Sequence, residues 1–299
     1  MTTIKPDTIA ITQDMITQNL QDVLQSISDC SQLYKHIQQP QLIAVSKTKG
    51  VELIIAAYNA GQRNFGENYV QELVQKSKEL PIDIDWHFIG HLQSNKIKQL
   101  LSVPNLQYIH TIDSIKLAEK IQKCLESEGT RRIIKVLIEV RTSPEESKIG
   151  GVEINTNQED GNQDNIDIRQ ILELIMYLQN ECRNLQFIGL MTVEKPGDYS
   201  CFDKLVRLKE ILLSCPEVEA RDKVLFCKSK DEQIQQEEND KQVEIDLIED
   251  MPGSRIRSKN INLSMGMSDS YQEAIKRGAD YLRIGSLIFG ERVKKSPKE

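Results

Sequence analysis

Lys47 and Lys49 stand in the segment Ala44-Val45-Ser46-Lys47-Thr48-Lys49, at the end of an apolar run, where a lysine can do covalent chemistry. A neutral lysine amine condenses with an aldehyde to a Schiff base. At the carboxyl end of a barrel strand the side chain of Lys47 would point into the mouth, where barrel active sites lie. Partial burial and the charge of Lys49 would favour the neutral amine. The alternative is two solvated lysines that open a loop, and this segment taken alone favours that alternative.

Two later segments, Leu263–Ser268 and Arg283–Gly290, each run from a predicted strand end into small residues and a predicted helix start. Backbone N–H groups and serine hydroxyls at such a place bind anions, and TIM barrels often hold phosphate after their last two strands. The alternative is a pair of ordinary helix caps. In a closed barrel these segments would neighbour Lys47, so a phosphorylated aldehyde such as pyridoxal 5′-phosphate (PLP) would bridge them. A phosphosugar also fits, because aldolases use a lysine in the same way.

Two further motifs have simpler interpretations. In Phe65–Glu72, Gly66 allows a tight turn, and Glu67 or Asn68 suits a helix N-terminus. His87 and His91 have the spacing of two zinc ligands on a helix, but the glutamate that would follow the first histidine is absent. We therefore expect no metal site, and we expect His87 to be a core histidine with satisfied hydrogen bonds.

Composition bounds the class of protein. The chain has 299 residues, a net charge of −7 and a pI near 5.4. It lacks the excess of basic residues that nucleic-acid-binding proteins usually carry, so nucleic acid is not expected as its partner. No apolar run reaches the roughly 18 residues that cross a bilayer, and the polar N-terminus lacks a secretory signal. None of the six cysteines forms a Cys-x-x-Cys pair. We expect free thiols in a reducing compartment, hence a cytoplasmic protein that does not bind membranes.

The elements that must position these residues alternate between short apolar runs and amphipathic stretches, which is typical of parallel α/β architecture. Residues 10–38 are expected to form an N-terminal helix. Eight candidate strands follow, at residues 41–46, 62–65, 85–89, 106–110, 133–140, 185–190, 260–264 and 281–284. Eight strands with intervening helices fit a single (β/α)₈ TIM barrel better than an open doubly wound sheet, which stays possible.

Two polar stretches, at residues 153–165 and 228–258, interrupt this alternation of apolar runs and amphipathic stretches. Their composition cannot bury enough surface to offset the entropy of ordering, so both are expected to be flexible surface insertions. A partner-docking loop is the functional alternative. The prediction is then one PLP-binding domain over residues 1–299.

Seven ordered blocks between about residues 41 and 292 resemble the pyridoxal phosphate homeostasis (YggS-like) family, whose barrel is similar to the N-terminal domain of alanine racemase. The blocks are AVSKTK at 44–49, FGENYVQE at 65–72, WHFIGHLQSNK at 86–96, EESK-x-G at 145–150, GLMT at 189–192, LSMGMS at 263–268 and RIGSLIFGER at 283–292. The chain departs from the family at three positions. Gly50 replaces a usual proline, which should loosen the turn after Lys47. Arg141 replaces a common asparagine, and Pro144 replaces a small residue.

The resemblance implies the cofactor PLP, with Lys47 as its Schiff-base lysine. It further implies that Ser264, Gly285 and Ser286 contact the phosphate and that Arg283 faces the pyridine nitrogen. No catalytic residue is predicted. The expected cofactor-binding set is Lys47, Asn68, Ser264, Met265, Arg283, Gly285 and Ser286.

A PLP carrier for vitamin B6 homeostasis and a PLP-dependent amino-acid racemase are the two functions to separate. Arginine does not accept a proton in practice, so Arg283 would leave the cofactor ring a weak electron sink. Racemases also take a second base from another domain and a partner subunit, whereas this sequence ends shortly after the eighth strand. We therefore expect a monomeric carrier that is not an enzyme, with PLP-requiring apo-enzymes as its partners. An aldolase would need an acid or base near Lys47 that the sequence cannot place.

Overall fold

The computed structural model describes residues 12–36, 38–142, 150–154, 156–157, 165–195, 197–215 and 261–291. The predicted insertion at 228–258 lies outside these residues. The described part of the insertion at 153–165 has secondary structure: β7 (Thr156–Asn157) pairs antiparallel with β8 (Asn165–Ile166), and β6 (Val152–Glu153) pairs with the end of a barrel strand. That residues 153–165 form a flexible surface insertion stays a prediction, because the pairing of these short strands needs only backbone groups.

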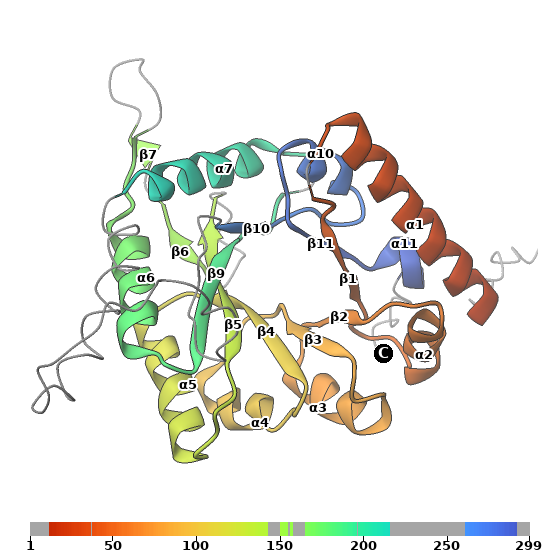
Figure 1. Cartoon of the computed structure of the whole chain (residues 1–299), viewed down its shortest axis with the longest axis horizontal. Coiled ribbons are helices and arrows are strands. Elements are labelled where there is room, and N and C mark those ends of the chain that lie inside the picture. The colour runs from red at the N-terminus through yellow and green to blue at the C-terminus, as the bar shows by residue number, and fades with distance from the viewer. Residues whose placement is uncertain are drawn as a thin grey trace, which may run out of the picture.

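Eight parallel strands in the described residues form a closed ring (Figure 1). They pair in chain order, and the ring closes where the first strand pairs with the last, which confirms the barrel over the open sheet. The expected and observed strands differ by no more than two residues at either end, as is usual at strand ends. The strands are β1 (Gln41–Val45), β2 (Asn64–Glu67), β3 (Asp85–Phe88), β4 (Leu106–Ile112), β5 (Ile134–Arg141), β9 (Leu185–Met191), β10 (Asn262–Ser264) and β11 (Tyr281–Ile284).

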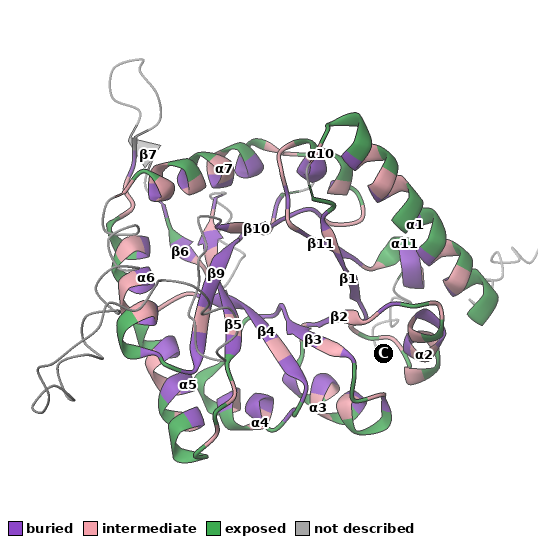
Figure 2. Cartoon of the chain, in the orientation of Figure 1, coloured by how far each residue is buried: buried purple, intermediate pink, exposed green. Residues whose placement is uncertain are grey.

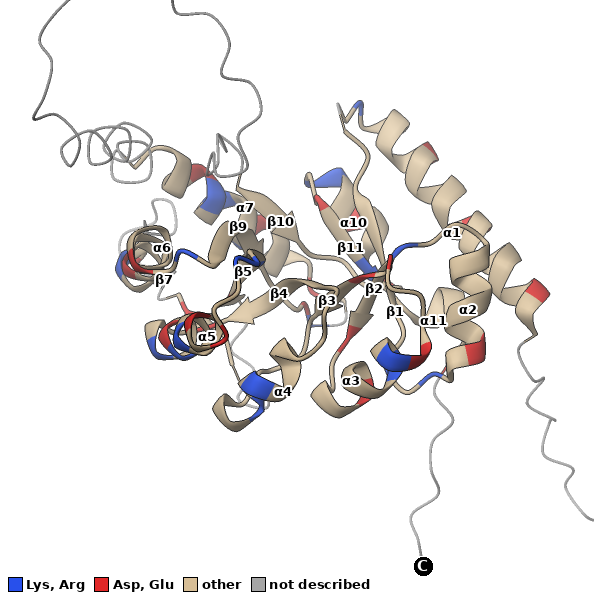
Figure 3. Cartoon of the chain, turned by 60° about the horizontal axis from the view of Figure 1, so that its bottom comes forward, with Lys and Arg blue, Asp and Glu red and all other residues tan. Residues whose placement is uncertain are grey.

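Helices surround the ring on its outside (Figure 1). They are α2 (Val51–Asn59), α3 (Val70–Glu79), η1 (Ser94–Lys96), α4 (Ile97–Leu101), α5 (Ile115–Ser127), α6 (Arg169–Glu181), α7 (Ser200–Leu213), α10 (Tyr271–Lys276) and α11 (Ser286–Phe289). Figure 3 shows charged residues along these outer helices, with both signs side by side on α5. No helix in the described ranges is long and apolar enough to span a membrane.

The N-terminal helix α1 (Gln13–Leu33) packs against α2, α10 and α11 and is shorter than the predicted 10–38. It begins after Thr12, whose side chain accepts a hydrogen bond from the backbone N–H of Met15, as a helix cap does. The buried face of this helix carries Ile16, Leu20, Val23 and Ile27. Met15 and Leu24 are exposed, because the buried positions follow a narrow stripe at helical spacing.

Two layers of side chains fill the structure. The larger lies between strands and helices, where the buried faces of the helices point inward (Figure 2). A smaller apolar layer lies inside the barrel, with members on β1, β4, β5, β9 and β11. Side chains on a strand alternate between these layers, so neighbouring residues face opposite ways. Ile43 belongs to the inner layer and Ala44 to the outer one.

Candidate functional site

Lys47 lies just beyond the carboxyl end of β1, and its side chain is partly buried. β1 pairs in parallel with β11, where Ala44 stands opposite Ile284. Gly285 comes directly after β11 and lies close to the end of β1: a Cβ on Gly285 would be 3.0 Å from the Val45 carbonyl oxygen. The predicted neighbourhood of Lys47 and the segment after the last strand is therefore confirmed.

A buried ion pair holds the backbone on the N-terminal side of Lys47. Ser46 donates from Oγ to Glu67 Oε1 at 2.6 Å, and the Lys76 ammonium donates to the same oxygen at 2.7 Å and to the Ser46 carbonyl at 2.9 Å. Burial raises the pKa of Glu67, an effect that the nearby Lys76 charge partly offsets. Glu67 therefore has a structural role on β2, and we refer to Ser46, Glu67, Glu72 and Lys76 as the clamp.

The clamp also holds the residue that follows Lys47. The backbone N–H of Thr48 donates to Glu72 Oε2 at 2.8 Å, and Thr48 has a φ of 65°, which is uncommon for a β-branched residue. Burial alone would raise the pKa of Glu72, but hydrogen bonds from Thr48 and Lys76 outweigh it and lower that pKa. Such strain persists only where surrounding contacts impose it. Lys47 is thus presented from a backbone fixed on both sides.

Lys49 binds the end of α11. Its ammonium donates to the carbonyls of Phe289 and Gly290 at 2.8 Å and to that of Glu291 at 3.1 Å, as cations do at helix C-termini. Gly50 has a φ of −70°, a value that proline also adopts, so this backbone angle is compatible with proline. The predicted looseness of the turn stays a prediction.

Arg283 points into the barrel and is almost fully buried. Its guanidinium donates to Ser264 Oγ at 2.7 Å and to the Thr192 carbonyl oxygen at 2.7 Å. Burial lowers its pKa, and the carboxylates of Glu194 and Glu139 oppose that shift. Because a guanidinium has only N–H donors, Arg283 can donate hydrogen bonds to a neighbouring group but cannot accept one.

Ser264 is fully buried at the end of β10 and connects Arg283 to two buried histidines. His110 Nδ1 lies 3.1 Å from Ser264 Oγ, and His110 Nε2 lies 2.9 Å from His87 Nδ1. The other ring nitrogen of His87 lies 2.9 Å from Asn64 Oδ1. The prediction that His87 is a satisfied core histidine is confirmed.

The remaining predicted residues have different surroundings. Met265 comes directly after Ser264, the last residue of β10, whose side chain faces inward. The Met265 side chain therefore points the opposite way and packs in the outer layer, so only its backbone can face the barrel mouth. Ser286 begins α11 and is exposed. Asn68 follows β2, and its Oδ1 is buried with no hydrogen-bond partner among the described residues.

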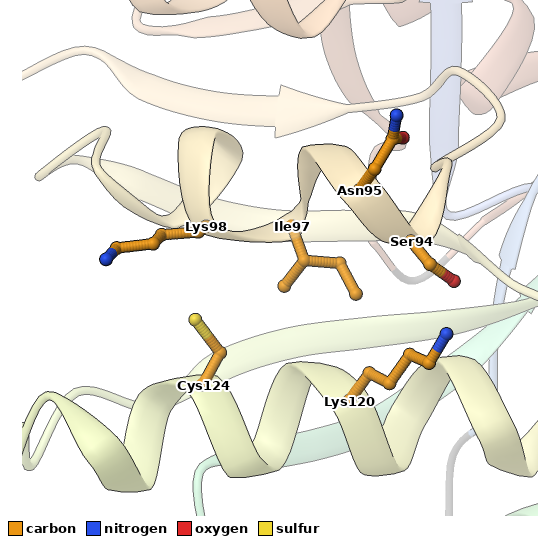
Figure 4. Close-up of a pocket in the computed structure, with 6 residues that line it drawn as sticks. All are labelled: Ser94, Asn95, Ile97, Lys98, Lys120 and Cys124. Atoms are coloured by element: carbon orange, nitrogen blue, oxygen red, sulfur yellow. The ribbon is translucent and has the colours of Figure 1, made fainter.

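His91 is exposed, with Nδ1 3.8 Å from Asp113 Oδ2. The described ranges hold no group of three or more His, Cys, Asp or Glu side chains that could bind a metal ion. A separate hollow of about 460 Å³ lies between η1–α4 and α5, and it contains none of the predicted cofactor residues (Figure 4).

The sequence alone does not predict the clamp or the histidine that partners His87. A lysine on an amphipathic helix, as Lys76 is, is usually solvated, and Glu67 suits a helix N-terminus. His110 could have been found by strand alternation: His87 and His110 both face inward from neighbouring strands. Thr192 contributes a carbonyl, which carries no sequence signal.

Comparison with known proteins identifies the family. The family model described as alanine racemase, N-terminal domain, matches residues 22–293. The chain belongs to this family. The human protein named pyridoxal phosphate homeostasis protein is 35% identical over 265 residues, which cover 85% of this chain and 77% of that protein. The resemblance inferred from the sequence blocks is therefore confirmed.

Solved structures agree with this assignment. PipY of Synechococcus elongatus, solved with PLP bound, is 26% identical, has a TM-score of 0.57 and is matched over 92% of this chain and 100% of its own. Alanine racemase of E. faecalis has a TM-score of 0.54 at 14% identity and is matched over 93% of this chain and 58% of its own, a likeness that shows the fold alone. The (β/α)₈ barrel of the alanine racemase N-terminal type is thus supported by both family and architecture.

Proposed function

We propose that this chain binds PLP at the carboxyl end of its barrel and acts in PLP homeostasis, with Lys47 as the covalent attachment point. The observation that carries the proposal is the position of Lys47 just beyond the carboxyl end of β1, beside the end of β11, where Arg283 and Gly285 lie. The names of the relatives and the PLP-bound state of PipY support the choice of ligand.

The residues present fit this cofactor. A Cβ on Gly285 would meet the Val45 carbonyl oxygen at 3.0 Å, so glycine lets the backbone after β11 lie close against the end of β1, beside Lys47. The buried Oδ1 of Asn68 has an unused acceptor among the described residues. Arg283 supplies buried donors, which suit an acceptor such as a pyridine nitrogen. Lysine, arginine and backbone donors together suit an aldehyde that carries a phosphate.

In this proposal each residue has one task. Lys47 would hold the cofactor covalently through Nζ. Ser264 and the segment Gly285–Ser286 hold the phosphate, and Arg283 faces the ring nitrogen. Asn68 and the backbone of Met265 complete the rim. The clamp keeps the Lys47 backbone in place while the cofactor enters and leaves.

We further propose that the chain is a carrier with weak or no catalysis. When bound, the cofactor supplies an electron-withdrawing ring, whose strength depends on protonation of its nitrogen. Arg283 does not transfer a proton to that nitrogen in practice. In this proposal the protein is a single-domain, cytoplasmic monomer that delivers PLP to apo-enzymes and does not act on nucleic acid. The alternative, an amino-acid racemase, is an outcome of the test.

The test is borohydride reduction of the purified, PLP-loaded protein followed by peptide mapping and absorption spectroscopy. We expect the adduct on Lys47, and we expect Lys47→Ala to lose both the visible absorption band and the bound cofactor. Lys78→Ala serves as the matched control, because Lys78 is exposed on α3, outside the site. A Lys47→Ala protein that keeps its band and cofactor content contradicts the attachment point. Robust racemisation of a common amino acid contradicts the carrier function.

A further inference from the structure

A continuous line of hydrogen bonds crosses the inside of the barrel. It joins Arg283 to Ser264 at 2.7 Å, Ser264 to His110 at 3.1 Å, His110 to His87 at 2.9 Å, and His87 to Asn64 at 2.9 Å. Both imidazoles are fully buried. The five residues come from β2, β3, β4, β10 and β11, so the line spans the closed ring of strands. We call it the relay.

Each imidazole of the relay is neutral. Burial lowers the pKa of His87 to about 3, and the charge of Lys135 adds to the shift. Burial also lowers the pKa of His110 well below its usual value, helped by His87 and Arg283. A neutral imidazole has one N–H donor and one acceptor nitrogen, so each ring can pass a hydrogen bond along in one direction only.

The Asn64 end of the relay sets that direction, because Arg283 donates to Ser264 whichever way the relay runs. Asn64 Oδ1 can only accept, so His87 Nε2 carries a hydrogen and His87 Nδ1 must accept from His110 Nε2. His110 Nδ1 then has no hydrogen and accepts from the Ser264 hydroxyl. The single hydrogen of Ser264 is thereby committed to His110, while its oxygen accepts from Arg283.

This arrangement conflicts with phosphate binding. A phosphate oxygen is an acceptor, and in the observed direction Ser264 has no hydrogen to offer it. We propose that Asn64, His87 and His110 are positioning residues that set the direction of the Ser264 hydroxyl, and that a bound phosphate reverses the whole relay. This inference rests on the proposed function, because the phosphate is that of PLP.

In the reversed state the Asn64 amide turns over and donates to His87, His87 donates to His110, and His110 donates to Ser264. Ser264 then donates to phosphate. Amide oxygen and nitrogen are nearly equal in size, so the turn needs no new space. Protons balance as follows. Ser264 passes its hydrogen to His110 Nδ1, His110 passes one to His87 Nδ1, His87 Nε2 releases one to water beside half-buried Asn64, and water returns one to Ser264.

The direct test is ¹⁵N NMR of protein labelled at histidine, since the chemical shift separates protonated from unprotonated ring nitrogens. We expect hydrogens on Nε2 of both buried histidines in the unloaded protein and in protein loaded with pyridoxal, which lacks the phosphate. We expect them on Nδ1 in protein loaded with PLP. Identical tautomers in all three samples overturn the relay. The visible band is recorded on the same samples, so failure of PLP attachment is seen separately from failure of the relay.

A variant tests the same idea by binding. Asn64→Asp at pH 8 presents only acceptors to His87 and should lock the observed direction. We expect its affinity for PLP to fall about 10- to 100-fold, the contribution of one hydrogen bond to a charged group, with pyridoxal affinity unchanged. Unchanged pyridoxal binding also shows that the variant folds.

The new negative charge could repel phosphate directly, and a double-mutant cycle separates this effect. In a Ser264→Ala background the relay has no hydroxyl to direct, so Asn64→Asp should cause no further loss of PLP affinity. If the loss persists in that background, charge repulsion explains it and the relay is overturned.

Discussion

Lys76→Met removes the cation that neutralises Glu67 and is the sharpest test of the clamp. The Glu67 side chain is 0% exposed and that of Lys76 8% exposed, with 2.7 Å between Lys76 Nζ and Glu67 Oε1. Methionine fills similar volume, so the change leaves a buried carboxylate without its ion pair. Breaking a buried pair in this way costs about 3–5 kcal/mol. We expect a loss of that size in the free energy of unfolding at pH 8.

The loss should depend on pH with a definite sign. Burial already raises the pKa of Glu67 above its value in the unfolded chain, so the folded state binds this proton more tightly. Stability from this group is therefore lost as pH rises from the unfolded to the folded pKa. Without Lys76 the pKa of Glu67 in the folded state rises further, so the pH range over which this stability is lost extends to higher pH. The variant should be closest to wild type in mild acid and furthest from it at pH 8.

The assay is urea denaturation at pH 5.5 and pH 8, with the slope against urea compared between variants. The control is the double variant Glu67→Gln/Lys76→Met, in which glutamine keeps an oxygen for the Ser46 hydroxyl but carries no charge. We expect it to recover most of the lost stability. A Lys76→Met protein within about 1 kcal/mol of wild type at pH 8, or a double variant no better than the single one, refutes the reasoning.

Three further predictions follow from the same region. Gly285→Ala places a Cβ 3.0 Å from the Val45 carbonyl and should weaken PLP binding about tenfold by titration; an affinity within twofold of wild type contradicts it. Thr48→Gly relieves a φ of 65° and should raise the free energy of unfolding by up to about 1 kcal/mol, whereas Thr48→Ala, which keeps its Cβ, should not. Gly50→Pro matches a φ of −70° and should stabilise by about 0.4–1 kcal/mol in urea, once the Glu52 side chain moves aside; a destabilised protein would show that proline does not fit.

Much of the fold could be predicted because its signals are local. Apolar runs of strand length alternate with stretches at helical spacing, and these patterns depend only on neighbouring residues. They located the barrel strands, and they put Lys47 and Gly285 at strand ends. The end of α1 at Leu33 could not be predicted, because the polar residues after it carry no strong stop signal.

What the sequence by itself determined was the order of elements and the residue types at the barrel mouth. Only the tertiary structure decided which of these residues meet. Closure of the ring through β1 and β11 brought Lys47 beside Gly285, although more than two hundred positions separate them in the chain. Packing of α3 against β2 gave Lys76 a buried carboxylate, and closure of the ring linked His110 to Ser264. Periodicity reports how one segment divides between core and solvent, whereas a hydrogen bond between distant strands depends on register and ring closure, which no local pattern records.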